Sequence, residues 1–215
     1  FITGYAEPVD IEKMAVSPYT LRKTIVDHID AEIRTAKAGG PGQIWFKMNS
    51  LVDPGIIDKL YEASQAGVEI DMVIRGICCL RPGVPGLSEN ITVTSIIDRF
   101  LEHARILYFY HGGDERVFIS SADWMTRNLD RRVELLVPIL DTDCKRKVIG
   151  ILKTCLRDNV RARRINSDGT YSPPAGGKVR PIRCQLECQR KAREAAETEQ
   201  ESNRTRFTPI EPQRM

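Results

Sequence analysis

Residues 91–128 read ITVTSIIDRFLEHARILYFYHGGDERVFISSADWMTRN, and this stretch decides the fold that we expect for the chain. It contains two short apolar segments, Ile106–Tyr110 and Val117–Ile119. The residues Gly112-Gly113-Asp114, which favour a turn, separate them. Two apolar segments joined by such a turn are typical of a β-hairpin. The stretch therefore predicts strand, turn and strand, preceded by another strand at residues 91–97.

Polar residues lie where the first hairpin strand begins and the second one ends. We expect the hairpin to bring four of them together: His103, Arg105, Ser121 and Asp123. A histidine can exchange protons near neutral pH, and an arginine can grip phosphate in two places. A hydroxyl can donate a hydrogen bond, and we expect Asp123 to orient His103. The pattern therefore indicates a site that handles phosphate, with Trp124 in the core beside it.

The rest of the chain alternates helices and strands, which is typical of an α/β sheet. Apolar residues recur every four positions from Leu21 to Ile33 and predict a helix, which Ser17-Pro18 would open as N-cap and first helical residue. The other predicted elements are strand 44–49, helix 54–66, strand 68–74, strand 133–137, helix 143–158 and a short helix within 178–194. We expect a single α/β domain, a mixed sheet flanked by helices, with a polar C-terminal tail.

More polar residues follow the predicted strands. Lys47 and Asn49 alternate at the end of one strand, so both point the same way, and Arg75 follows the next strand. Ligands collect at the carboxyl ends of strands in α/β sheets. Arg127 and Asn128, just after the hairpin, would extend the same phosphate track.

Composition limits the possible classes of function. A hydrophobic content of 41% and a charged content of 28% are ordinary for a soluble globular domain. A net charge of +3 is too small to indicate a nucleic-acid partner, and no apolar run is long enough to span a bilayer. Six cysteines without a Cys-x-x-Cys pair predict reduced thiols and no metal site. We expect a cytoplasmic protein.

The ends of the chain suggest how it is organised. It begins with Phe1 rather than methionine, so we expect a piece of a longer protein. Residues 1–165 would form the domain, with 1–16 leading in from a preceding one. Residues 166–194 would form a C-terminal loop and helix, and the polar residues 195–215 a disordered tail.

Several separated motifs resemble bacterial polyphosphate kinases. The segment SIIDRFLEHARILYFYHGGDERVFISSADWMTRN closely resembles the C-terminal part of that family. KMNSLVD (47–53), GVEIDMVIRGICCLRPGVPGLSENI (67–91) and MAVSPYTLR (14–22) resemble it in the same order. The C-terminal half of the family consists of two phospholipase-D-like domains. This chain resembles the second of them, over roughly residues 1–190.

The phospholipase-D-like pattern is His-x-Lys followed by Gly-Ser-x-Asn. Here it reads His103-Ala104-Arg105 and Ser120-Ser121-Ala122-Asp123, so lysine has become arginine and asparagine has become aspartate. These departures argue against phosphodiester hydrolysis and suit the kinase branch.

The resemblance implies reversible transfer of the terminal phosphate of ATP to inorganic polyphosphate, with Mg²⁺. His103 matches the family's second essential histidine, assigned to ATP binding and proton transfer, and Arg75 matches an ATP-binding arginine. The histidine that is phosphorylated in the family lies in the preceding domain, and neither His28 nor His111 matches it. The implied partners are ATP or ADP, polyphosphate, the rest of the parent chain and further copies of the enzyme. We expect this piece to be inactive alone, and peripheral attachment at the inner membrane stays open.

Two other functions remain open at this point. One is a phospholipase-D-like phosphodiesterase or nuclease that completes its site by dimerisation. The other is a non-catalytic phosphate-binding fragment.

Overall fold

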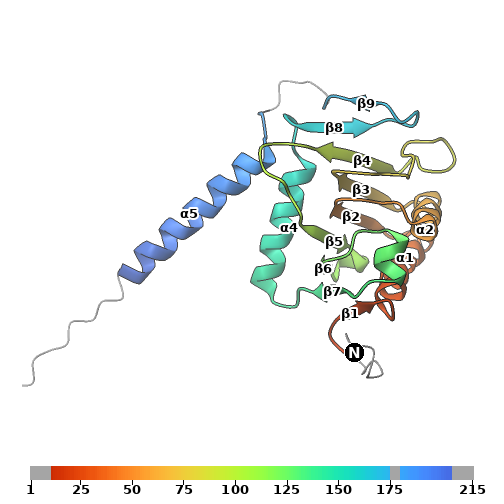
Figure 1. Cartoon of the computed structure of the whole chain (residues 1–215), viewed down its shortest axis with the longest axis horizontal. Helices are drawn as coiled ribbons and strands as arrows, with labels where there is room; N and C mark the ends of the chain where they lie inside the picture. The colour runs from red at the N-terminus through yellow and green to blue at the C-terminus, as the bar shows by residue number, and fades with distance from the viewer. Residues whose placement is uncertain (1–10, 175–179, 205–215) are drawn as a thin grey trace, which may run out of the picture.

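The structure, a computed structural model, describes residues 11–174 and 180–204. These residues form one nine-stranded sheet with helices on both faces (Figure 1). The strand order is β1-β7-β6-β5-β2-β3-β4-β8-β9. The elements are, in chain order, β1 (Ala15–Ser17), α1 (Leu21–Lys37), β2 (Gln43–Met48), α2 (Pro54–Gln65), β3 (Glu69–Ile74), β4 (Ile91–Ile96), β5 (Arg105–Phe109), the 3₁₀ turn η1 (His111–Gly113), β6 (Arg116–Ser120), α3 (Thr126–Asp130), β7 (Glu134–Pro138), α4 (Thr142–Leu156), β8 (Ala162–Ile165), β9 (Tyr171–Ser172) and α5 (Cys184–Arg204).

The sheet is mixed, which confirms the predicted fold class. Strands β2, β3 and β4 are parallel, whereas β5 runs antiparallel to β2 and pairs with β6 in the predicted hairpin. The carboxyl ends of β2, β3, β4 and β6 therefore lie at the same edge of the sheet as the amino end of β5. We call this the site edge, because the predicted polar residues lie along it.

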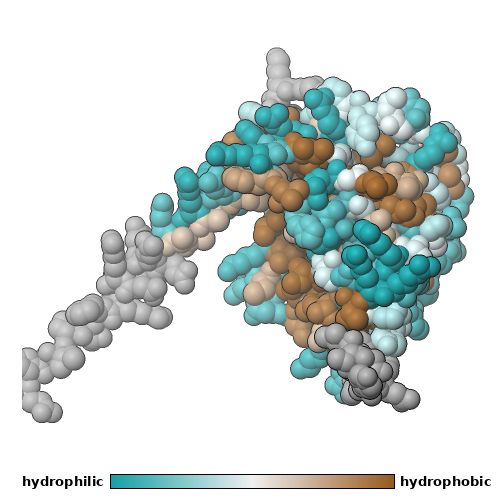
Figure 2. Space-filling view, viewed as in Figure 1, coloured by the Kyte–Doolittle hydropathy of each residue, from teal (hydrophilic) through white to brown (hydrophobic). Residues whose placement is uncertain are grey.

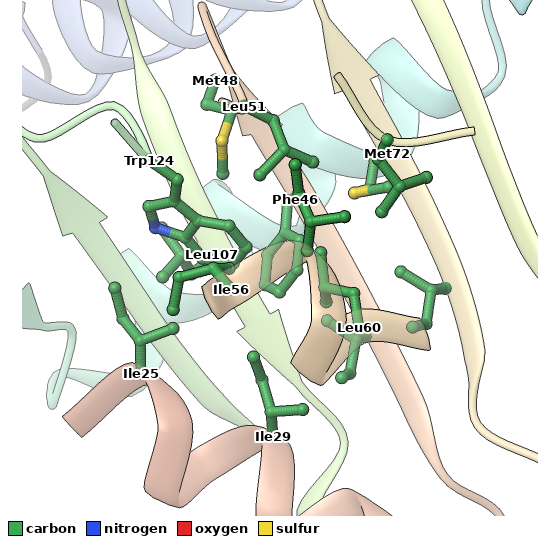
Figure 3. Packing of buried hydrophobic residues seen from close by; sticks show 14 of the residues in the cluster. Ile25, Ile29, Phe46, Met48, Leu51, Ile56, Leu60, Met72, Leu107 and Trp124 are labelled. Carbon is green, nitrogen blue, oxygen red and sulfur yellow. The ribbon is translucent and has the colours of Figure 1, made fainter. Parts of the chain in front are cut away.

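Alternating side chains divide the core between the two faces of the sheet. On one face, Ile25 and Ile29 of α1 and Leu60 of α2 pack with Phe46 and Trp124 (Figure 3). Trp124 is 1% exposed, which confirms its predicted place in the core. Burying one such side chain contributes about 1.5–3 kcal/mol, so this face holds the sheet and helices together.

Helix α4 covers the opposite face. Its residues Ile149 and Leu152 pack against Tyr108 of β5 and Val117 of β6. Because α4 and the pair α1 and α2 lie on different faces, the sheet is a middle layer and its edge stays open to ligands (Figure 1).

The helices predicted at 54–66 and 143–158 are confirmed as α2 and α4, and an aspartate caps each of them. Asp53 caps α2 by accepting a hydrogen bond from the Ile56 amide at 3.1 Å, and Pro54 is the first residue of that helix. Asp141 caps α4 by accepting from the Cys144 amide at 2.8 Å. An aspartate or serine at this position satisfies an amide that the helix itself leaves unpaired.

The predicted start of the first helix is wrong. Helix α1 begins at Leu21, with Thr20 as its N-cap. Ser17 instead belongs to β1, which pairs with β7, and its hydroxyl donates to the Asn128 carbonyl at 2.6 Å. The peptide bond between Ser17 and Pro18 is cis.

The C-terminal part of the chain differs most from the prediction. Strands β8 and β9 were not predicted, and they extend the sheet beyond β4. Helix α5 runs from Cys184 to Arg204 rather than within 178–194, so the predicted disordered tail is wrong for residues 195–204. The rest of that tail, 205–215, and residues 1–10 of the predicted lead-in lie outside the described residues.

Helix α5 is anchored at its first turn and then leaves the body of the protein (Figure 1). Cys184 is buried in a small cluster with Cys155 of α4 and Ala162 of β8. In the part of α5 whose side chains are described, one side is hydrophilic and the other is weakly hydrophobic (Figure 2). Within residues 11–174 and 180–204, none of the helices combines the length and apolar character that a membrane span requires.

Candidate phosphate-binding site

Asp123 is the centre of the polar network at the site edge. It follows β6, is 8% exposed, and accepts hydrogen bonds from the Asn49 and Ser50 amides at 2.8 and 3.1 Å. It also accepts from Nε of Arg105 at 3.2 Å and from its Nη2 at 2.8 Å. Burial raises the pKa of Asp123, but the hydrogen bonds and the charge of Arg105 outweigh it, so the net pKa lies below the usual value. Asp123 therefore stays ionised and ties β5 and β6 to the end of β2.

Arg105 connects this network to the histidine. Its Nη1 lies 3.0 Å from Nδ1 of His103 and donates to the His103 carbonyl at 3.0 Å. The Arg105 side chain is 9% exposed, whereas His103 is exposed at the rim. Our expectation that Asp123 orients His103 directly is wrong, because the hydrogen bonds of Asp123 go to Arg105 and to two backbone amides. Asp123 positions Arg105, and Arg105 positions the imidazole.

Arg75 and Asn49 form the second part of the site. Nε and Nη2 of Arg75 donate to Oδ1 of Asn49 at 3.2 and 2.9 Å. The other half of that amide, Nδ2 of Asn49, is buried and has no hydrogen-bond partner among the described residues. A buried donor without a partner costs about 1–3 kcal/mol, and a phosphate oxygen would satisfy it.

Lys47 lies beside them, but its charge is already paired. Its Nζ lies 2.7 Å from Oε2 of Glu102, and the Lys47 side chain is 7% exposed. Gln185 of α5 donates to the other carboxylate oxygen of Glu102 at 2.8 Å. We did not predict Glu102 or Gln185 from the sequence, because nothing local indicates that α5 returns to this edge.

The remaining predicted site residues are held elsewhere. The Ser121 hydroxyl bonds to Glu134 and accepts from the Leu135 amide at 3.0 Å, so it supports the pairing of β6 with β7. Arg127 is exposed on α3, and Asn128 is 4% exposed beneath it. The structure thus brings together six of the nine predicted residues: Lys47, Asn49, Arg75, His103, Arg105 and Asp123.

The described residues do not fit a magnesium ion held by the protein. No three His, Cys, Asp or Glu side chains among them come close enough to share a metal. The two carboxylates at the site edge, Asp123 and Glu102, are paired with Arg105 and Lys47. Mg²⁺ prefers carboxylate oxygens together with substrate phosphates, and here the free groups are cations and amides.

Comparison with known proteins gives a consistent result. Residues 14–185 match the family model described as polyphosphate kinase C-terminal domain 2. The chain is 54% identical over 170 residues to a polyphosphate kinase of Halalkalibacterium halodurans, covering 79% of this chain and 24% of that protein. A polyphosphate kinase of Burkholderia vietnamiensis is 53% identical over 179 residues, covering 83% of this chain and 26% of that protein. The chain therefore spans about a quarter of the length of these relatives.

Solved structures agree with this match. A crystal structure of polyphosphate kinase from Porphyromonas gingivalis superposes with a TM-score of 0.87 at 44% identity, covering 91% of this chain and 30% of that one. The phospholipase D family member Nuc from Salmonella typhimurium superposes with a TM-score of 0.52 at 16% identity, over 72% of this chain and 97% of that one, which shows the fold alone. The fold is thus phospholipase-D-like, as predicted, and the chain belongs to the polyphosphate kinase C-terminal domain 2 family.

Proposed function

We propose that this chain forms the ATP- and phosphate-binding part of a polyphosphate kinase, which transfers the terminal phosphate of ATP reversibly to inorganic polyphosphate. The observation that carries the proposal is the pair Arg75 and Asn49. The arginine has a neutral amide as its partner, and that amide presents a buried donor that no other described residue satisfies. A phosphate oxygen at this position would compensate the charge of Arg75 and accept a hydrogen bond from Nδ2 of Asn49.

The arrangement suits phosphoryl transfer, which depends more on charge neutralisation and alignment than on covalent chemistry. Arg75 and Asn49 would hold non-bridging oxygens of the phosphates. His103 is exposed in front of Arg105, where its imidazole could grip the transferring phosphate or hand a proton to a leaving oxygen. Asp123 would act through Arg105 as a positioning residue.

The rest of the reaction would take place with other parts of the enzyme. The histidine that accepts the phosphate lies, by this proposal, in a different domain, since the chain spans about a quarter of its relatives. Mg²⁺ supplies charge neutralisation on the nucleotide phosphates when it is bound. The described carboxylates at the site edge are paired with Lys47 and Arg105 and do not hold it.

The test replaces His103 with glutamine in a complete polyphosphate kinase whose C-terminal part is this chain. If the imidazole exchanges a proton or grips phosphate, His103→Gln lowers the rate in both directions by roughly 10²–10⁴-fold. His103 is exposed, so the unfolding temperature stays near that of the wild type. His111→Gln, the same change at the opposite end of β5, is the matched control and keeps near-normal rates.

Two results would contradict the proposal. Near-normal rates for His103→Gln would remove the histidine from the reaction. Hydrolysis of a phosphodiester, without phosphate transfer to polyphosphate, would favour the phospholipase-D-like phosphodiesterase instead.

A further inference from the structure

A cavity of about 430 Å³ lies beside the site edge, between the ends of β3 and β4 and the added strands β8 and β9. Three arginines line it: Arg75, Arg161 and Arg163. We call it the arginine pocket. Ser95, at the end of β4, and Tyr171 of β9 complete its polar wall.

The pocket shares one residue, Arg75, with the proposed phosphate site. The guanidinium of Arg75 bonds to Asn49 in that site, while the same residue lines the pocket. The Ser95 hydroxyl donates to the Arg75 carbonyl at 3.4 Å, which links β4 to the shared arginine. Arg75 therefore lies between the Asn49 amide and the pocket wall, where it can contact an anion on either side.

Two of the arginines lie on one side of the chain at the start of β8. Arg161 and Arg163 flank Ala162, which is buried in the cluster under α4, so both arginines point away from that cluster. Two residues along an extended strand span about 7 Å, so the pair presents a row of positive charge rather than a single point. Arg163 pairs with Ser95 across the β4–β8 ladder, which keeps the row against the pocket wall.

The charges in the pocket are only weakly compensated. Among the described residues, the carboxylate that faces Arg161 is Asp98, whose Oδ1 lies 3.6 Å from Nε of Arg161. Asp98 already accepts hydrogen bonds from Nε of Arg183 at 2.8 Å and from Nη2 of Arg183 at 2.5 Å. The charge of Asp98 is therefore compensated mainly by Arg183 and only weakly by Arg161. Arg75 is bonded to a neutral amide. None of the described residues that line the pocket is a carboxylate. A ribose diol is typically held by a carboxylate, so this lining suits phosphates better than a nucleoside.

We propose that the arginine pocket is a second subsite, which binds phosphates of an inorganic polyphosphate chain beyond those held by Arg75 and Asn49. This inference rests on the proposed function and specifies where the polymeric substrate lies. Arg161 and Arg163 bind the chain, and Arg75 is shared between the two subsites.

The experiment measures binding of ATP, tripolyphosphate and long-chain polyphosphate to the 215-residue chain by titration calorimetry. Arg161→Gln/Arg163→Gln lowers the affinity for long-chain polyphosphate about tenfold or more, because charged hydrogen bonds are lost. The affinity for ATP stays within about twofold. Arg163→Gln alone gives a smaller loss in the same direction, and thermal unfolding confirms that each variant folds.

Arg164→Gln is the matched control. It removes the same charge from the same strand, but Arg164 alternates with Arg163 and lies near Asp71 on the α4 face. We expect it to leave the affinities for all three ligands unchanged. Long-chain binding that is insensitive to Arg161 and Arg163, or as sensitive to Arg164, would overturn the subsite.

The outcomes also separate this inference from the proposed function. If Arg75→Gln weakens ATP and polyphosphate binding but the double variant weakens neither, only the second subsite is wrong. If the double variant weakens ATP and polyphosphate equally, the pocket belongs to the nucleotide and the inference is wrong. If the wild-type chain binds none of the three ligands, both proposals fail.

Discussion

Replacing Asp123 with asparagine tests how the site edge is held together. The change keeps the shape of the side chain and one oxygen, which can still accept from the Asn49 and Ser50 amides. It removes the charge that faces Arg105, and it puts an amide NH₂ where Nη2 of Arg105 now donates at 2.8 Å. The two side chains are 9% and 11% exposed, so the arginine is left as a nearly buried, uncompensated charge.

The expected cost follows from this burial. Removing one partner of a buried ion pair destabilises a protein by about 3–5 kcal/mol, and the two retained amide contacts place Asp123→Asn near the lower value, about 3 kcal/mol. For a domain of this size that corresponds to a fall in Tm of roughly 6–12 °C. The matched control is Asp114→Asn, whose partner Arg116 is 44% exposed, and it costs at most about 1 kcal/mol.

The dependence on pH distinguishes the lost charge from a packing defect. The pKa of Asp123 is lower in the folded protein, so its contribution to stability is fully present above the unfolded pKa of about 3.9 and is lost as pH falls through the folded pKa. Chemical unfolding at several pH values should show the full gap between wild type and Asp123→Asn above about pH 5, and a shrinking gap below about pH 4. A gap no larger than that of Asp114→Asn, or one that does not change with pH, would refute this account.

Three further predictions concern charge and protonation. Arg75→Ala should weaken the use of ATP or polyphosphate in the complete kinase far more than it lowers Tm, and Arg75→Lys should recover only part, because lysine lacks the guanidinium fork; unchanged kinetics would remove Arg75 from the site. The purified 215-residue chain should make no polyphosphate from ATP, and sustained chain growth would contradict this. Burial, with the nearby charges of His111 and Arg116, lowers the pKa of His28 to about 4. NMR should therefore show no titration of the His28 imidazole near pH 6.5. The free energy of unfolding should decline as pH falls from about 6.5 towards 4, because the unfolded protein takes up the proton first.

Local sequence patterns predicted the central elements of the fold. The four-residue repeat from Leu21 to Ile33 became the buried face of α1, and the predicted helix 54–66 became α2. The hairpin formed because its glycine-rich turn and apolar segments are all encoded within a few residues. In these elements, the local physical rule and the structure agree.

The features that were missed depend on contacts between distant parts of the chain. Strand β8 reads Ala-Arg-Arg-Ile, without an alternating apolar pattern. It is stabilised by pairing with β4, in which Thr94 lies 70 residues before its partner Arg164. Ser17 has the chemistry of an N-cap, but its hydroxyl bonds to the Asn128 carbonyl instead. Ser121 matched a motif position, yet its hydroxyl serves the pairing of β6 with β7. The sequence shows which side chains have the chemistry for a cap or a ligand site. The tertiary hydrogen bonds decide which of these side chains are free to take that role.

The three cations at the site edge differ in how much of their charge is free to bind a phosphate. Arg105 faces Asp123, and Lys47 faces Glu102, so each of these pairs is close to neutral. Lys47 is 7% exposed and would be a costly buried charge without Glu102, so a phosphate can use it only by displacing that carboxylate from the lysine. Arg75 differs because its partner is the neutral amide of Asn49. Of the three, it is the cation whose charge an entering phosphate can use without breaking an ion pair, and its removal should therefore weaken phosphate binding more than that of Lys47.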